Sequence, residues 1–192
     1  MSWNNIIPVE AVVPQTFFTS DIHFWHKNII DFCKRPFGSV EHMNEQLIKN
    51  HNMVVGKQDH VWYLGDLSFG TYDQTAECLD QLNGIKHLIV GNHDRKGRAE
   101  KLFNRDWEKW FVEKHDYLRL KIGEHRFAVC HFPFASWERG YINLHGHLHS
   151  LAGYKNKWRQ YDVGVDANNY APVHIADVIK RAEQGEKLAD FY

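Results

Sequence analysis

The sequence has few cysteines and no long apolar run. Its 192 residues include only Cys33, Cys78 and Cys130, an odd number without close pairing. A disulfide framework or a thiolate zinc knuckle would use more, so free thiols in a reducing cytosol are the simpler interpretation. No segment approaches the roughly 18 uncharged apolar residues of a membrane span. Because residues 1–14 also lack a basic start followed by an apolar stretch, we expect a soluble, cytoplasmic protein without membrane contact.

An excess of charge of one sign is also missing. The chain has 23 Lys and Arg against 24 Asp and Glu, a formal net charge of −1. This balance excludes an overall basic field for nucleic acid or a membrane surface, so any polyanion must bind locally. Repeats, low-complexity tracts and Pro/Gly/Ser-rich linkers are absent as well. With 43% hydrophobic residues, the chain is predicted to form one domain over residues 1–192 with a sizeable core.

Histidine is the residue present in excess. The 14 histidines outnumber the 13 glycines, although glycine is normally among the commonest residues. Histidine is the commonest metal ligand in proteins. The count therefore indicates a metal site, and the positions of the histidines in the sequence test this indication.

The apolar pattern predicts strands that alternate with helices. Short apolar runs that end in polar residues are typical of buried strands, and apolar residues three and four apart are typical of helices. The expected strands are residues 16–20, 61–64, 87–90, 118–122, 126–130 and 141–144. The expected helices are residues 40–54 after Ser39 as N-cap, residues 75–82, and residues 175–182 ending at Gly185. Gly123 and Glu124 favour a hairpin turn between two of the strands. This alternation predicts α/β layers.

Residues that can bind metal follow most of the expected strands. They are Asp21-Ile22-His23, Gly65-Asp66, Gly91-Asn92-His93-Asp94, His131 and Gly146-His147-Leu148-His149. Ligands gather at the carboxyl ends of strands in open α/β sheets, so these motifs are expected to converge on one rim. Imidazoles mixed with carboxylates suit Mn, Fe, Zn or Ni, whereas an all-oxygen set would suggest Mg or Ca.

Local spacing supports the convergence. In an extended chain, residues two apart point the same way, so Asp21 and His23 are expected to share a direction, as are His147 and His149. Glycine precedes three of the motif residues and allows close backbone approach where side chains would collide. These glycines are Gly65, Gly91 and Gly146.

The ordered series from Asp21 to His149 resembles the calcineurin-like metallophosphoesterase superfamily. Its pattern is Asp-x-His, Gly-Asp, Gly-Asn-His-Asp, a lone His and then Gly-His-x-His, and every element is present in order. The stretch from Ser20 to Asn28 and the triplet Arg35-Pro36-Phe37 are similar to a small bacterial and phage subgroup. The resemblance implies a sandwich of two mixed β-sheets flanked by helices. The short length implies a catalytic domain without a large cap.

The same resemblance implies two divalent metal ions. The first would be held by Asp21, His23, Asp66 and His149. The second would be held by Asp66, Asn92, His131 and His147, which makes Asp66 the bridge. Mn is favoured, with Zn, Fe or Ni as alternatives. Two such ions and two aspartates leave a local charge of +2, which would attract a phosphate ester into one cleft.

Four further residues receive expected roles beside the metals. The resemblance makes His93 the group that protonates the leaving oxygen, with Asp94 orienting its ring. Alternatively, Asp94 caps a helix through residues 98–103. His26 and Arg35 are candidates for contact with a substrate phosphate. The alternatives are a supporting or packing role for His26 and a solvated surface position for Arg35.

The implied activity is hydrolysis of phosphate esters by attack of a metal-bound hydroxide. Phosphodiesters are favoured, either a cyclic nucleotide or a short nucleic-acid end. Phosphomonoesters and nucleotide pyrophosphates stay open, because selectivity depends on loops such as residues 132–140 and 151–159. Gly-Asn-His-Asp stands where phosphoprotein phosphatases of this superfamily usually carry Gly-Asn-His-Glu, which disfavours that activity. A non-catalytic scaffold is also disfavoured, because no assigned position is missing.

Overall fold

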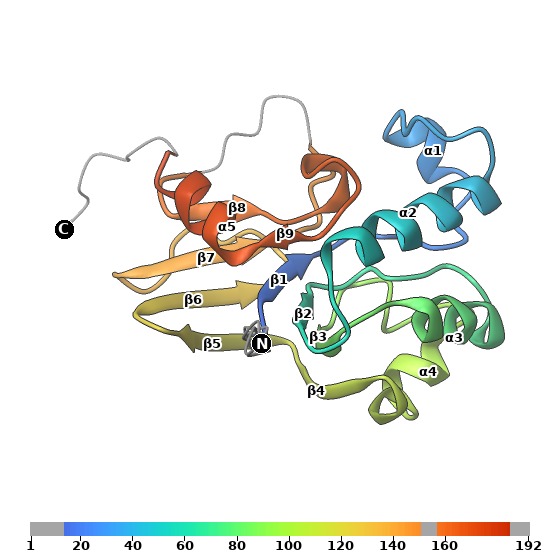
Figure 1. Ribbon diagram of the computed structural model, residues 1–192, viewed down its shortest axis with the longest axis horizontal. Helices are drawn as coiled ribbons and strands as arrows, with labels where there is room; N and C mark the ends of the chain where they lie inside the picture. Colours follow the sequence, from blue (N-terminus) through green and yellow to red (C-terminus); the bar gives the residue numbers. More distant parts are fainter. Residues whose placement is uncertain (1–13, 151–156, 185–192) are drawn as a thin grey trace, which may run out of the picture.

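Two mixed β-sheets form the centre of the protein in a computed structural model that describes residues 14–150 and 157–184 (Figure 1). The first sheet has the order β4 (Phe111–His115), β3 (Ile85–Ile89), β2 (His60–Tyr63), β1 (Thr16–Thr19), β9 (Val173–His174). The second sheet has the order β5 (Tyr117–Ile122), β6 (His125–Cys130), β7 (Tyr141–His145), β8 (Gln160–Asp162). The predicted architecture of two mixed sheets flanked by helices is confirmed.

Strand direction brings many carboxyl ends to the same edge of each sheet. Strands β1 to β4 are parallel to one another, and only β9 runs antiparallel beside β1. In the second sheet β5 and β6 are antiparallel, whereas β6, β7 and β8 are parallel. The predicted hairpin is confirmed, because Ile122 pairs with His125 and Gly123 has φ +57° in the turn.

The helices lie mainly against the outer face of the first sheet. Their bounds are α1 Ile29–Phe32, α2 Val40–Val54, α3 Tyr72–Gln81, α4 Glu100–Asn104 and α5 Ile175–Ala182. Ser39 caps α2 as predicted, since its side chain accepts the His42 N–H at 3.2 Å. The predicted stop at Gly185 lies outside the described residues. Within the described ranges, no helix is both long and apolar enough to cross a membrane.

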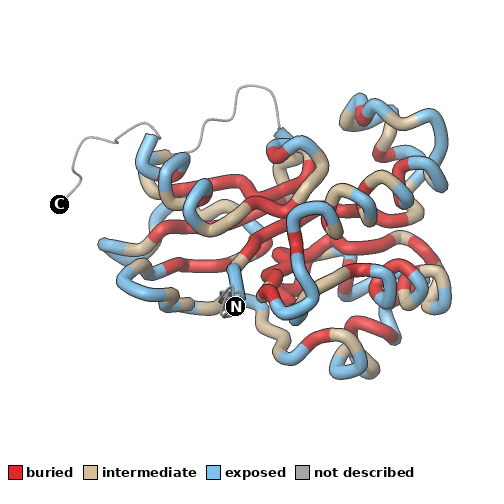
Figure 2. The backbone as a smooth tube through the Cα atoms, viewed as in Figure 1, coloured by how far each residue is buried: buried red, intermediate tan, exposed pale blue. Residues whose placement is uncertain are grey.

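Alternating strand residues divide the core into two layers. Phe17 on β1 joins Met43 of α2 and Leu79 of α3 in the cluster beneath the helices. The next residue, Phe18, faces the other way and joins Phe127 and Leu144 of the second sheet. Figure 2 shows that the buried stretches follow the strands, while most connecting segments are exposed. The two sheets are thereby packed face to face, and their strand ends meet along one rim.

Candidate metal centre

The predicted metal ligands come together at the carboxyl ends of five strands. Asp21, Asp66 and Asn92 follow β1, β2 and β3 of the first sheet. His131 and His147 follow β6 and β7 of the second sheet. The site therefore lies where the edges of the two packed sheets meet, as the convergence of strand ends predicts.

The ligand-bearing loops have an unusual backbone. Positive φ angles occur at Asp21 (56°), His23 (55°), Asp66 (54°), His147 (70°) and His149 (48°). The predicted extended backbone at the spaced pairs is therefore wrong, since the strands end before them, although Asp21 and His23 still face a common point. The left-handed conformation is unfavourable for such residues by about 1–2 kcal/mol each. Strain of this kind concentrates at functional sites, where surrounding contacts hold it in place.

Hydrogen bonds between the loops hold this backbone. Asp21 N–H donates to Gly65 O at 3.0 Å, and His23 N–H donates to Asp66 O at 3.1 Å. His147 N–H donates to Asp21 Oδ2 at 2.8 Å, which ties the second sheet to the first. A Cβ atom at Gly146 would overlap Asp21 Oδ2, so glycine is required for this approach.

One group of possible ligands consists of Asp21, His23 and His149. The Nε2 atoms of His23 and His149 are 3.2 Å apart. Asp21 Oδ1 lies 3.9 Å from His23 Nε2 and 3.7 Å from His149 Nε2. Two imidazole nitrogens and a carboxylate oxygen thus face a common point, as the donors of a metal site do.

A second group consists of Asp66, His131 and His147. His131 Nε2 lies 3.4 Å from Asp66 Oδ2 and 3.0 Å from Asn92 Oδ1. The same Asp66 oxygen is 3.9 Å from His23 Nε2 in the first group. Asp66 therefore stands between the groups, in the position that a bridging carboxylate requires.

Partners on the far side of two imidazole rings set which nitrogen faces the site. His131 Nδ1 is 2.7 Å from the Leu64 carbonyl oxygen, which can only accept, so Nδ1 carries the proton. His149 Nδ1 is 2.8 Å from Asp166 Oδ2, and there the ring donates in the same way. In the neutral ring each Nε2 is then left with a lone pair directed into the site. Such partners are typical of metal-binding histidines.

A buried atom without a partner shows that these residues fit a cation. Asp21 Oδ1, which faces the first ligand group, is buried and has no hydrogen-bond partner among the described residues. Burial, together with nearby Asp66 and Asp162, raises the pKa of Asp21 to about 7 despite nearby histidines. Buried polar groups without partners are rare in proteins and require an explanation. A divalent ion would stabilise the Asp21 carboxylate, and the mixed nitrogen and oxygen donors suit Mn, Fe or Zn.

Asp94 does not orient His93, contrary to the prediction. Its Oδ2 accepts the N–H groups of Asp66 (2.9 Å) and Gly91 (2.8 Å), and its Oδ1 accepts the Leu67 N–H (3.0 Å). No hydrogen bond or ion pair joins it to the His93 ring within the described residues. The alternative of a helix cap is also wrong, because α4 begins after Ala99. Asp94 instead holds the loops after β2 and β3 together from beneath.

We expect Asp94→Asn to destabilise the fold. Whichever way the amide turns, its NH₂ group faces at least one backbone N–H that the carboxylate accepted. Hydrogen bonds to charged groups contribute about 1.5–3 kcal/mol, so a loss of about 2–4 kcal/mol is expected in denaturant unfolding. Unchanged stability together with a reduced turnover would contradict this assignment and restore a role for Asp94 in orienting His93.

Arg35 lies beneath the site rather than in the cleft, contrary to the prediction of substrate contact. It is 3% exposed, which also excludes the alternative of a solvated surface position. Its guanidinium makes a two-pronged ion pair with Asp166, with both N···O distances 2.8 Å. It also donates to the carbonyl oxygens of Ile22 (2.9 Å) and Asp21 (2.7 Å). The Arg35 N–H groups that point toward the site therefore already donate to protein atoms and are not available to a substrate phosphate.

Asp166 is the residue that sequence reasoning missed. It joins Arg35 to His149, and these two partners keep the pKa of the Asp166 carboxyl below its usual value although burial opposes this. The available signal was the run from Tyr161 to Asp166, which alternates apolar residues with Asp or Gly and includes the unpredicted strand β8. Asp166 can also group with Cys33 and His149. Burial raises the pKa of the Cys33 thiol to about 11, which keeps it protonated and makes it a poor ligand.

Three other histidines lie at or near the site. His93 is half-exposed, and its Nε2 lies 3.9 Å from Asp66 Oδ2. His26 packs on Phe69 with ring centroids 4.0 Å apart, and its Nδ1 accepts the Ile29 N–H at 3.1 Å. His145 is fully buried. This arrangement places His93 beside the ligands, whereas the contacts of His26 are those of the packing role.

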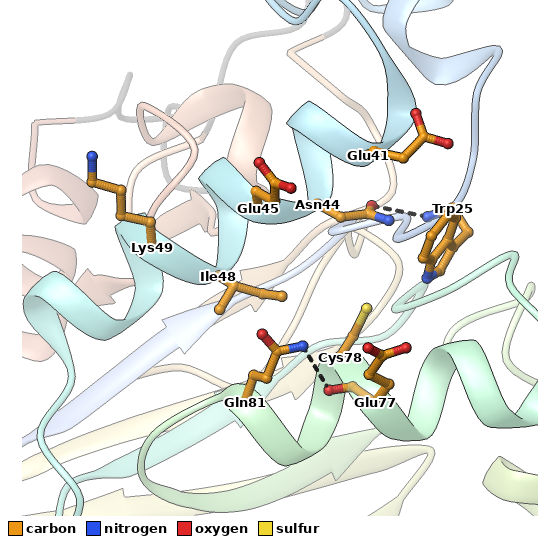
Figure 3. Close-up of a pocket in the computed structure, with 9 residues that line it drawn as sticks. All are labelled: Trp25, Glu41, Asn44, Glu45, Ile48, Lys49, Glu77, Cys78 and Gln81. Carbon is orange, nitrogen blue, oxygen red and sulfur yellow. Dashed lines mark hydrogen bonds between the residues drawn. The ribbon is translucent and has the colours of Figure 1, made fainter.

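A groove of about 420 Å³ lies between α2 and α3, away from the predicted ligands (Figure 3). Trp25 lies at one end of the groove, two residues after His23. Its backbone N–H donates to Asn44 Oδ1 at 3.1 Å, and its φ is +62°. The helices therefore anchor the loop that carries His23.

Comparison with known proteins identifies the family. A family model described as calcineurin-like phosphoesterase matches residues 15–182. The chain belongs to this family. An uncharacterized protein from Methanocaldococcus jannaschii is 36% identical over 179 residues, which cover 88% of this chain and 92% of that protein. The gene 66 protein of Mycobacterium phage L5 is 32% identical over 185 residues, covering 79% of this chain and 86% of its own.

A solved structure agrees with the architecture of this calcineurin-like phosphoesterase. The crystal structure of a protein of unknown function from Aquifex aeolicus aligns with a TM-score of 0.67 and 23% identity. The alignment covers 88% of this chain and 100% of that one, and at this identity it establishes the fold alone. The family implies metal-dependent hydrolysis of phosphate esters, and the two ligand groups are where such metals would bind.

Proposed function

We propose that this protein is a phosphodiesterase that uses two divalent metal ions, Mn being the favoured metal. The observation that carries the proposal is the position of Asp66 between two groups of ligand atoms. In this proposal residues 1–192 act as one catalytic domain without a large cap. The first ion is held by Asp21, His23, Asp66 and His149. The second is held by Asp66, Asn92, His131 and His147.

Asp66 and His93 have different roles in the proposed reaction. Divalent ions held by the two ligand groups would supply polarisation of the phosphoryl oxygens and a water of lowered pKa. Asp66 Oδ2 faces both ligand groups. Its Oδ1 accepts the His93 N–H at 2.9 Å, which fixes the backbone of His93 beside them. The His93 ring, half-exposed beside Asp66, donates a proton to the oxygen of the leaving group as the P–O bond breaks.

The charge of the site supports a diester. Arg35, which donates to the Asp21 carbonyl beside the first ligand group, is buried and paired with Asp166 and with backbone carbonyls. A phosphomonoester dianion benefits from an additional cation against its free oxygens. Two ions and two aspartates leave a local charge of +2, which the attacking hydroxide would lower to +1, and the single negative charge of a diester balances this without Arg35. The described residues therefore favour the diester over the monoester.

We expect His93→Ala to retain both ions but to lose turnover. Positioned proton transfer contributes about 10²–10⁴ in rate, so kcat should fall within this range. A nitrophenyl diester should lose least, because nitrophenolate leaves without a proton, and a dinucleotide should lose most. The measurements are kcat on both substrates and the metal content of the purified variant. Equal activity of variant and native protein on the dinucleotide would overturn the role of His93.

A further inference from the structure

A cavity of about 460 Å³ adjoins the second ligand group. Its volume falls within the range of about 300–1,000 Å³ that is usual for small-molecule sites. Its lining comprises Val90, Gly91, Asn92, Arg95, Lys96, Asp116, Cys130 and Phe132. Asn92 belongs both to this lining and to the proposed ligand set. A phosphate bound at the ions would consequently extend one of its substituents into the cavity.

Phe132 provides an aromatic surface at this position. Phe132 is 44% exposed. Its ring centroid lies 5.0 Å from that of His131 and 4.7 Å from that of His147. Both contacts are T-shaped, and the exposed part of the ring is available to a planar group. Nucleobases stack on such rings without a requirement for a particular base.

The cavity also gathers positive charge in a chain whose net charge is −1. Its lining contains two cations, Arg95 and Lys96, and one carboxylate, Asp116, which leaves a local charge of +1. Arg95 is ion-paired with Asp116, but both side chains are at least half-exposed, and exposed pairs of this kind are weak. No ion pair engages Lys96 in the part of the chain that the structure describes. A phosphate group could therefore recruit both cations.

We propose that this cavity is a subsite for a nucleotide that bears a second phosphate. The base stacks on Phe132, and the second phosphate contacts Lys96 and Arg95 while the scissile phosphate lies at the ions. This inference rests on the proposed function and narrows it to linear, nucleic-acid-derived diesters with a terminal phosphate. A cyclic nucleotide has one phosphate and would leave the cations unused. Hydrolysis consumes one water: its oxygen forms a bond to phosphorus, the P–O bond to the leaving group breaks, and the leaving oxygen gains a proton and departs as an alcohol.

Substrate discrimination tests the subsite. We expect native protein to hydrolyse a dinucleotide with a 5′-phosphate about tenfold better in kcat/KM than the same dinucleotide without it. Lys96→Gln should reduce this ratio toward one. Lys101→Gln, which removes an exposed lysine of α4 outside the cavity lining, should leave the ratio at its native value. A native ratio of one, or equal ratios in the two variants, would overturn the proposal.

Binding without turnover separates this inference from the proposed function. A nucleoside 3′,5′-bisphosphate and the corresponding ribose bisphosphate without a base are titrated calorimetrically into the metal-loaded protein. Phe132→Leu should weaken binding of the nucleoside ligand about tenfold and that of the baseless ligand much less. Loss of both affinities to the same extent would reject base stacking. If the ligands bind as expected but no diester is hydrolysed, the subsite stands and the proposed activity fails.

Discussion

Asp66→Asn is expected to abolish metal-dependent hydrolysis. The variant retains an oxygen that can accept the His93 N–H, but it loses the negative charge that faces both ligand groups. Each ion then loses its shared anionic ligand, and at least one site should empty at micromolar metal. Because bound metal contributes several kcal/mol of transition-state stabilisation, kcat should fall by about 10³-fold or more. Metal analysis and a nitrophenyl diester assay measure both effects.

Asp59→Asn is the matched control for this variant. Asp59 is also a buried aspartate, and it precedes β2 at the end opposite to Asp66. It accepts the backbone N–H groups of Gln15 and Gly56, both at 2.8 Å. Its replacement should lower stability but leave two ions and the native kcat. If the Asp66 variant retains two ions with full turnover, the bridging role is excluded.

Asp166→Asn should weaken one metal site and spare the other. The asparagine cannot accept all three hydrogen bonds that the carboxylate accepts from Arg35 and His149, since one of its two terminal atoms is a donor. The His149 ring then loses its anionic partner and faces either a neutral amide oxygen or an NH₂ group, and losses of this kind reduce metal affinity about 10–100-fold. Calorimetric titration with Mn²⁺ should show one weakened site and one site of native affinity.

Two comparison variants separate this positioning role from a general loss of stability. Arg35→Met leaves the Asp166 to His149 hydrogen bond in place, so it should lower stability more than it lowers metal affinity. Glu113→Gln removes a carboxylate that accepts from His87 at 2.7 Å and His115 at 2.8 Å, outside the ligand groups. It should leave both affinities unchanged. Equal weakening of both sites by Asp166→Asn would show that Asp166 acts on the whole fold rather than through His149.

Patterns of local periodicity predicted the long and regular elements well. Helix α2 begins after Ser39 as expected, because a capping side chain and a continuous apolar face act together. Strands β4, β8 and β9 were not predicted. The last two have three and two residues, too short for a pattern to develop. The residues of β4 after Phe111 alternate little between buried and exposed, so the sequence of this strand shows no clear alternation of apolar and polar residues.

The structure brings the predicted ligand residues close together, whereas the contacts that support them were not predicted. The motif residues carry their own signal, since Asp, His and Asn at strand ends have little other reason to cluster. Arg35 and Asp94 are charged residues that the fold buries completely or nearly so, and burial depends on distant segments. Arg35 meets Asp166 across 131 residues of sequence, a pairing that local spacing does not encode.

The central claim is that two metal ions occupy adjacent sites that share Asp66. Electron paramagnetic resonance of metal-free protein titrated with Mn²⁺ tests it most directly, because neighbouring Mn²⁺ ions couple magnetically only when a few ångströms apart. We predict the spectrum of a spin-coupled pair when two equivalents per chain are bound, and the loss of that coupling in Asp66→Asn. Saturation at one equivalent, or two equivalents with the spectrum of isolated Mn²⁺ ions, would contradict the proposed dinuclear centre.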